Sequence, residues 1–359
     1  MEKIGYLNSF LISSAGYVVT LSIPLFLISK FNASPFILGI AGFFGNFSYT
    51  TFTYIFHKLR LKLDFPWFIL SSLLISINYF FLQFCPHYKY LFILFFLNGI
   101  FYSRFWPSIQ YLFSKNSFHL NKFNLSWAGG VIFGMFISGY LFKIKETLPF
   151  LIGSFFAFIS FLSGFLYFEK FRLFYKGLPE KFYRKNHLDK EIKKVIFLNF
   201  TNFFVVGGML FIFPKLANII GYSSPLISNI LTLLFLMRFF MFYILSKIEI
   251  VFNEKILFFS YLSLCLSFVV TGILKNATFH AIFISLLGIS SAYSYRLAIF
   301  KIIEKGISTE LHEAVIGIGL FTGSLIVGIL SQIFGIFNGF IFSGALVLLF
   351  FLFQEYLLK

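Results

Sequence analysis

The chain repeats itself at a shift of about 189 residues. Glycines and prolines are informative markers for such a comparison, because they stand where backbone geometry or close packing is demanding. Three glycine pairs share this shift: Gly130 with Gly319, Gly134 with Gly323, and Gly139 with Gly328. Gly99 and Gly288 share it as well, and the prolines near residues 24 and 35 recur 190 residues later. The nearly constant shift between these pairs predicts two copies of one structural unit.

Composition places this duplicated chain in a membrane. It is 59% hydrophobic and 12% charged, whereas soluble domains have roughly 25% charged residues. A spanning helix needs about 20 apolar residues, and the sequence offers twelve such stretches. They are predicted at 4–29, 36–57, 65–85, 90–114, 123–143, 148–168, 194–214, 224–246, 255–274, 279–303, 313–335 and 338–356. Folding in water is thereby excluded.

The predicted fold class is an all-α polytopic membrane protein, with 12 transmembrane helices arranged as two six-helix pseudo-symmetric bundles. The N-terminal bundle is expected at 1–168 and the C-terminal bundle at 194–359, with a cytoplasmic linker at 169–193. The linker mixes aromatic and charged residues. Both a solvated connection and a short amphipathic helix on the membrane surface fit that pattern.

Basic residues predict the orientation. The expected internal segments carry 20 of the 29 Lys and Arg residues and the external loops carry 6. Both termini are therefore expected in the cytoplasm, in the cytoplasmic membrane, because positive loops stay inside. The net charge of +16 reflects this topology and attraction to anionic lipid, so no nucleic-acid partner is expected. The expected partners are the lipid bilayer and a small-molecule solute, with the chain acting as a monomer.

Motifs for enzyme chemistry are missing from the sequence. The two cysteines lack paired spacing and the six histidines are scattered, so no metal site or disulfide is expected. No Gly-x-x-x-x-Gly-Lys-Ser/Thr loop is present, which disfavours ATP hydrolysis. We expect no catalytic residues and no cofactor, and therefore no enzyme.

Two segments carry a family resemblance. NGIFYSRFWPSIQYLFSK and the glycine-rich FNLSWAGGVIFGMFISGYLF are similar to helices 4 and 5 of the major facilitator superfamily. The family's signature between helices 2 and 3 is reduced here to TYIFHKLRLKLD, in which Lys58 and Arg60 keep the basic character but His57 replaces the aspartate. The resemblance implies alternating access, in which two six-helix bundles rock around a central site. It also implies a gating role for Lys58 and Arg60.

Three arginines fall inside predicted spans, where each costs roughly 2.5–3.5 kcal/mol on insertion scales and should face a cavity or a partner. Arg104 and Arg296 lie in equivalent helices at nearly equivalent depth. Two guanidinium groups suit a carboxylate or phosphate, so one hypothesis is an anionic solute held by this pair. The alternative is a structural or gating role. Arg238 is the weaker site candidate, because its same-face neighbours are apolar.

Further polar residues form stripes at helical spacing, and polar groups at membrane depth need partners. The candidates for solute contact are Tyr17, Asn46, Asn202 and Tyr293. Bonding between helices is the other interpretation of each. Six of the repeated glycines are expected in gating or helix packing, namely Gly130, Gly134, Gly139, Gly319, Gly323 and Gly328. Glu313, near the start of the eleventh span, is the acidic residue that comes closest to membrane depth.

The function predicted from these features is transport of a small solute across the cytoplasmic membrane by alternating access. One alternative is export of hydrophobic drug-like compounds or lysolipids. A second alternative is a non-transporting receptor or assembly factor.

Overall fold

A computed structural model describes residues 2–58, 65–113, 117–176, 189–245, 247–248, 252–305 and 309–357, and these residues contain helices and no strands. The first seven helices are α1 (Glu2–Phe31), α2 (Pro35–Lys58), α3 (Trp67–Leu82), α4 (Tyr88–Tyr111), α5 (Ser117–Ile144), α6 (Leu148–Phe165) and α7 (Phe168–Lys176). The other seven are α8 (Lys190–Phe211), α9 (Phe213–Ile220), α10 (Ser224–Leu245), α11 (Glu254–Ile273), α12 (Ala277–Glu304), α13 (Thr309–Phe334) and α14 (Ile336–Leu357). A helix lies over each of the twelve apolar stretches.

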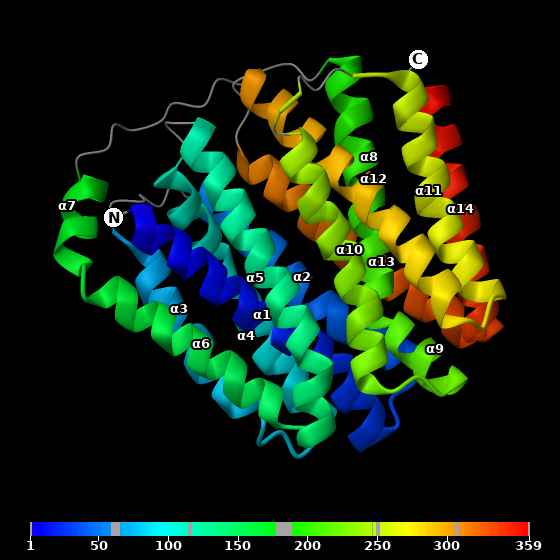
Figure 1. Ribbon diagram of the computed structural model, residues 1–359, viewed down its shortest axis with the longest axis horizontal. Helices are drawn as coiled ribbons and strands as arrows, with labels where there is room; N and C mark the ends of the chain where they lie inside the picture. The colour runs from blue at the N-terminus through cyan, green and yellow to red at the C-terminus, as the bar shows by residue number, and fades with distance from the viewer. Residues whose placement is uncertain are drawn as a thin grey trace.

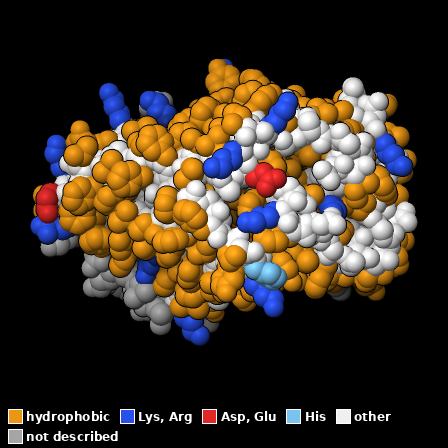
Figure 2. Space-filling view, turned by 90° about the horizontal axis from the view of Figure 1, so that it is seen from below, with side chains coloured by type: hydrophobic (Ala, Val, Ile, Leu, Met, Phe, Trp, Pro, Cys, Tyr) orange, Lys and Arg blue, Asp and Glu red, His pale blue; other side chains and the backbone are white. Residues whose placement is uncertain are grey.

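The outer surface suits lipid. Nine helices in the described ranges are long and apolar enough to cross a membrane. Large apolar side chains such as Phe155, Phe259 and Leu352 are more than half exposed, which water would disfavour and hydrocarbon would not. Figure 2 shows hydrophobic side chains over much of one end of the molecule, with Lys and Arg side chains scattered between them. The protein is a multi-pass membrane protein.

The seventh apolar stretch differs from its prediction. Its helix begins at Lys190, inside the predicted linker, where Asp189 caps it by accepting a hydrogen bond from the Ile192 backbone N–H at 2.9 Å. It ends at Phe211, and α9 starts directly afterwards with Pro214 in its first turn. Pro24 stands at the related place in α1, which continues through it unbroken. A proline removes one backbone donor, so it permits a break without requiring one.

The predicted linker is helical in its first part. Helix α7 covers Phe168–Lys176, and residues 177–188 lie outside the described residues. Figure 1 shows α7 at the edge of the molecule, beside the end of α6. The short-helix alternative therefore describes the start of the linker.

The helices form two side-by-side groups. In Figure 1 helices α1–α6 occupy the left of the view and helices α8–α14 the right, with the N-terminus and the C-terminus toward the same end. The groups meet along two seams, one between α2 and α13 and the other between α5 and α10. Because the two seams flank α1 and α8, residues of these central helices face a space between the groups.

Six glycines set the spacing of these helices, and their contacts repeat with the sequence. A methyl group on Gly130 or Gly134 would overlap carbonyl oxygens of α1, and one on Gly319 or Gly323 would overlap carbonyl oxygens of α8. The third glycine of each set packs across a seam instead. The seam contacts are Gly139 against the Ser224 carbonyl and Gly328 against the Pro35 carbonyl and Gly39.

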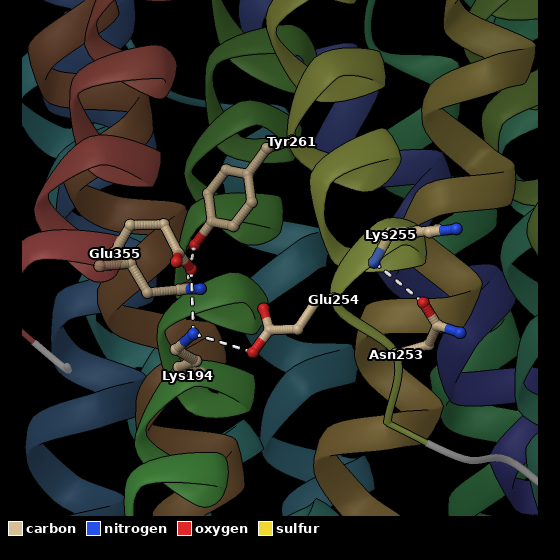
Figure 3. A network of polar contacts seen from close by, with 7 residues as sticks. Lys194, Asn253, Glu254, Lys255, Tyr261 and Glu355 are labelled. Atoms are coloured by element: carbon tan, nitrogen blue, oxygen red, sulfur yellow. Dashed lines mark hydrogen bonds and ion pairs between the residues drawn. The ribbon is translucent and has the colours of Figure 1, made fainter.

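Ion pairs fasten the C-terminal group near the end that carries the termini. Lys194 of α8 donates to Glu254 of α11 at 2.9 Å and to Glu355 of α14 at 3.0 Å. Beside them, the Tyr261 hydroxyl donates to Gln354 at 2.6 Å. Figure 3 shows Glu254 of α11 and Glu355 of α14 on either side of the Lys194 ammonium. One side chain therefore joins three helices of this group.

Candidate functional site

A cavity of about 180 Å³ lies between the two groups of helices. The wall comes from both groups, with side chains of α1, α2, α4 and α5 on one side and of α8, α12 and α13 on the other. Its polar members are Ser13, Tyr17, Thr20, Asn46, Tyr49, Asn98, Tyr102, Gln110, Asn124, Tyr295 and Glu313.

Aromatic rings make up much of the remaining wall. They come from Phe95, Trp106, Phe123, Trp127, Phe203 and Phe211. A concave site with an apolar lining and a few placed polar groups is the usual form of a small-molecule site. The cavity therefore suits a solute that combines a flat or apolar part with hydrogen-bonding groups.

Glu313 is the acidic residue of the cavity wall, and it joins α13 to the N-terminal group. The Tyr49 hydroxyl of α2 donates to one carboxylate oxygen at 2.7 Å, and the Gln110 amide of α4 donates to the other at 3.0 Å. A methyl group on Gly317, one turn further along α13, would overlap the Thr50 hydroxyl of α2. The α2–α13 seam is thus held by hydrogen bonds to a carboxylate as well as by close backbone packing.

Arg238 lies behind the aromatic wall in a cage of rings. Its guanidinium carbon is 5.4 Å from the ring centre of Trp127, 5.2 Å from Phe203, 5.5 Å from Phe242 and 4.9 Å from Tyr295. Its side chain is 1% exposed. Trp127, Phe203 and Tyr295 also line the cavity, so the same rings separate the cation from the cavity.

The guanidinium has no hydrogen-bond acceptor among the described residues. All three of its nitrogens are buried without a hydrogen-bond partner there. Aromatic faces attract the positive charge by roughly 2 kcal/mol or more when water is excluded, but they leave the five N–H donors of an arginine unused. A buried, unpaired charge is costly, and this arrangement is therefore suited to receiving an anionic acceptor.

More polar atoms without partners lie on the C-terminal side of the cage. His312 packs on the Tyr295 ring at 4.8 Å between centres and contacts the Asn199 amide at 3.4 Å. Asn202 follows Asn199 by one turn of α8, and both of its amide atoms are buried without a hydrogen-bond partner in the described part of the chain. Asn202, a predicted solute contact, is thus buried and does not line the cavity.

The other predicted solute contacts are distributed between the cavity and its surroundings. Tyr17 and Asn46 line the cavity, where Asn46 donates to the Gly42 carbonyl at 2.9 Å. Tyr293 is buried on α12 and is not a lining residue. Arg104 stacks on Phe56 with 3.8 Å between the guanidinium carbon and the ring centre.

Arg104 and Arg296, predicted as a pair, are not brought together at the cavity. Arg104 also faces Trp67 at 5.2 Å, and Arg296 donates to the Phe242 carbonyl at 3.2 Å. Neither side chain lines the cavity. Arg238, predicted as the weaker site candidate, is the one that faces rings of the cavity wall.

The predicted gating residues have different locations. The six repeat glycines pack helices tightly, as described above. Lys58 is exposed at the end of α2, and Arg60 lies outside the described residues. No group of three His, Cys, Asp or Glu side chains that could hold a metal occurs within the described ranges.

The sequence interpretation missed the ring cage and the bonds to Glu313. Trp127, Phe203 and Tyr295 lie on three helices, and neither their common target nor its contact with them is visible in a linear pattern. One signal was present. Arg238 and Tyr49 are 189 residues apart, so the repeat itself links the cage to the Glu313 bonds.

Comparisons of the whole fold find membrane transporters. The chain matches nucleoside transporter NupG with a TM-score of 0.72 at 12% identity, covering 100% of this chain and 99% of that one. It matches a POT family transporter, solved in complex with 5-aminolevulinic acid, with a TM-score of 0.75 at 12% identity, covering 100% and 96%. A bacterial homologue of the human lysosomal transporter Spinster matches with a TM-score of 0.69 at 10% identity, covering 99% and 95%.

Sequence comparisons find nothing of this kind: no protein-family model and no curated protein sequence matches the chain. At identities of 10–12%, the structural likeness establishes the fold alone. It confirms the predicted resemblance to the major facilitator superfamily at that level.

Proposed function

We propose that this protein is a membrane transporter that carries a small solute by alternating access through the cavity between its two groups of helices. The observation that carries the proposal is the composition of the cavity wall, to which both groups contribute. A site built in this way opens to one side or the other when the groups rock against each other. The fold shared with known transporters supports the same reading, and an enzyme is not proposed.

The proposal includes twelve spanning helices in two bundles, at 1–168 and 194–359, joined by a cytoplasmic linker at 169–193. The repeated glycine contacts on α1 and α8 support two equivalent bundles. The excess of basic residues in alternate connections supports cytoplasmic termini and a location in the cytoplasmic membrane. Lys58, at the end of α2, keeps its proposed gating role on the cytoplasmic side.

The solute is proposed to be small and partly flat, because the cavity is limited in volume and rich in rings. The hypothesis that Arg104 and Arg296 hold an anion requires both side chains to leave their present contacts. Uptake of succinate that is lost in Arg104→Gln and in Arg296→Gln would support it. Equal uptake by both variants and the parent would contradict it.

A second candidate function is export of hydrophobic drug-like compounds, which the ring-rich lining favours. An exporter of that kind would accept many apolar cations or neutral dyes without a fixed hydrogen-bonding pattern. The test measures how much ethidium cells accumulate. Lower accumulation in cells that express the protein than in cells that lack it, with the same reduction in Asn46→Ala, would favour this candidate over a selective solute carrier.

The proposed test cross-links the end of the molecule opposite the termini. Lys215 of α9 donates to Asn32, which follows α1, at 3.3 Å, so the two positions join the groups there. In a Cys85→Ser/Cys265→Ser background, cysteines at positions 32 and 215 are bridged by a short thiol-specific linker with a reducible bond. Uptake of uridine, 5-aminolevulinic acid, succinate and inorganic phosphate is then measured in proteoliposomes.

At least one probe should accumulate in the proteoliposomes before cross-linking. Its uptake should stop when the bridge forms and resume when the bond in the linker is reduced. The single variant Asn32→Cys, treated with the same reagent, controls for modification alone and should keep its uptake. Transport that continues at full rate through the bridged protein would contradict alternating access about this cavity.

A further inference from the structure

The repeat assigns equivalent positions to two pairs of polar residues. Tyr49 and Arg238 are 189 residues apart, and so are Asn124 and Glu313. In the α2–α13 seam, the tyrosine hydroxyl donates to the glutamate carboxylate at 2.7 Å. In the α5–α10 seam, the equivalent positions hold a guanidinium group and a neutral amide. The first seam has its own anion, whereas the second has only the cation.

We propose that Arg238 binds an oxyanion, the carboxylate or phosphate group of the transported solute. The proposal rests on the proposed transport function and names the chemistry of its solute. The guanidinium is fully buried, its nitrogens have no hydrogen-bond acceptor among the described residues, and the rings around it supply none. A carboxylate or phosphate takes two parallel N–H···O bonds from such a group and supplies the charge that Glu313 supplies in the other seam.

Two rings control the path from the cavity to the guanidinium. Trp127 of α5 and Tyr295 of α12 stack with 6.1 Å between their centres and 14° between their planes. Both line the cavity on one side and face Arg238 within 5.5 Å of their centres. Together with Phe203 they separate the guanidinium from the cavity, so the proposed anion binding requires these rings to move. The two rings come from different groups of helices, so anion binding at Arg238 is linked to the contact between the groups.

The rings also supply a direct probe. The chain has three tryptophans, at positions 67, 106 and 127, so Trp67→Phe/Trp106→Phe leaves Trp127 as the sole reporter. Its fluorescence is titrated in detergent with sodium succinate and with inorganic phosphate, at ionic strength matched by sodium chloride. Uridine serves as the neutral probe. The same titrations are made in Arg238→Gln and Arg238→Lys. Arg172→Gln serves as the control, because Arg172 lies on α7, pairs with Glu169 and does not line the cavity.

The expected result is a saturable fluorescence change with succinate or with phosphate. A response to succinate indicates a carboxylate solute, and a response to phosphate indicates a phosphate solute. The apparent affinity should fall at least tenfold in Arg238→Gln, fall less in Arg238→Lys, and stay unchanged in Arg172→Gln. The absence of a saturable response to both anions overturns the proposal, and so does a response of equal affinity in Arg238→Gln. If the glutamine variant fails to elute as a folded protein, the lysine variant decides: unchanged affinity there overturns the proposal.

Failure of this inference is distinguishable from failure of the transport proposal. Cross-link-sensitive uptake together with no anion response would leave a transporter whose solute does not use Arg238. An Arg238-dependent anion response together with uptake that ignores the cross-link would leave an anion site in a protein that does not work by alternating access.

Discussion

The two seams between the helix groups share a scaffold and differ in chemistry. Each has a glycine packed against a carbonyl oxygen of the other group, Gly328 against Pro35 and Gly139 against Ser224, and both pairs keep the repeat shift. Near the cavity, hydrogen bonds to Glu313 close the α2–α13 seam. The α5–α10 seam, which Ser224 and Ser228 also bridge by hydrogen bonds, encloses Arg238 there without an acceptor among the described residues. Both copies keep the close backbone packing, whereas the polar side chains at equivalent positions of the two seams differ.

The largest expected effect on stability comes from disrupting the glycine contact that both seams share. Gly139→Val places a branched side chain where even a methyl group would overlap the Ser224 carbonyl. Overpacking costs about 1–3 kcal/mol and occasionally more, and the rigid backbone at this contact places Gly139→Val at the upper end, so folded yield and thermal midpoint should fall sharply. Gly129→Val is the matched control on α5, because its nearest neighbours are 3.8 Å from an added Cβ. Equal loss in both variants would show that α5, and not the seam, is sensitive.

Arg238→Met is expected to raise the stability of the protein, whereas Gly139→Val lowers it. Replacing buried ionic groups by apolar residues of similar volume is neutral or stabilises proteins by about 1–4 kcal/mol, and the charge of Arg238 has no ion-pair partner to lose. We therefore expect a higher thermal midpoint than the parent in anion-free detergent buffer. Tyr49→Met, at the equivalent position of the other seam, should lower it because Glu313 loses a donor. A lower midpoint for Arg238→Met would show that the ring cage alone satisfies the guanidinium.

Tyr49→Phe tests the α2–α13 seam with a smaller change. It removes only the hydroxyl that donates to Glu313, and a hydrogen bond to a charged group contributes about 1.5–3 kcal/mol. The thermal midpoint should fall by an amount that fits this range. Tyr54→Phe, an exposed tyrosine on the same helix, should leave it unchanged.

The smallest effect concerns the start of α8, outside both seams. Asp189 caps this helix, and the hydrogen bond from the Ile192 backbone, followed by Lys305, lowers the pKa of its carboxyl group. Because the folded-state pKa is depressed, the stabilisation is present at neutral pH and is lost as the pH falls below the ordinary range of an aspartate. Asp189→Ala should cost about 1 kcal/mol at neutral pH and less in acid. Asp189→Asn, which keeps a capping oxygen, should cost less than the alanine variant.

The helices and their close contacts were accessible to sequence reasoning because they depend on local properties. Apolar length predicts a spanning helix, and a glycine repeated at one shift predicts a repeated close approach. The break between α8 and α9 was not predictable from Pro214, because Pro24 occupies the related place in an unbroken helix.

The site was less accessible, since it depends on how each helix is rotated about its axis. Arg104 and Arg296 lie at similar depth in equivalent helices, yet they face Phe56 and the Phe242 carbonyl. The apolar neighbours of Arg238 looked like a reason to discount it. In the fold, rings from α5, α8 and α12 join those neighbours and form the cage, which no single segment contains.

The ring cage also has a consequence for how the chain enters the membrane during synthesis. Arg238 must be inserted within α10 after Trp127 and Phe203 have been made, but before Tyr295 exists. An arginine at a helix centre costs roughly 2.5–3.5 kcal/mol on insertion. Apart from Phe242 of α10 itself, the cage rings that already exist as α10 emerges are those of α5 and α8. The ring of Tyr295 on α12 arrives last and encloses the cation only when about four-fifths of the chain has left the ribosome.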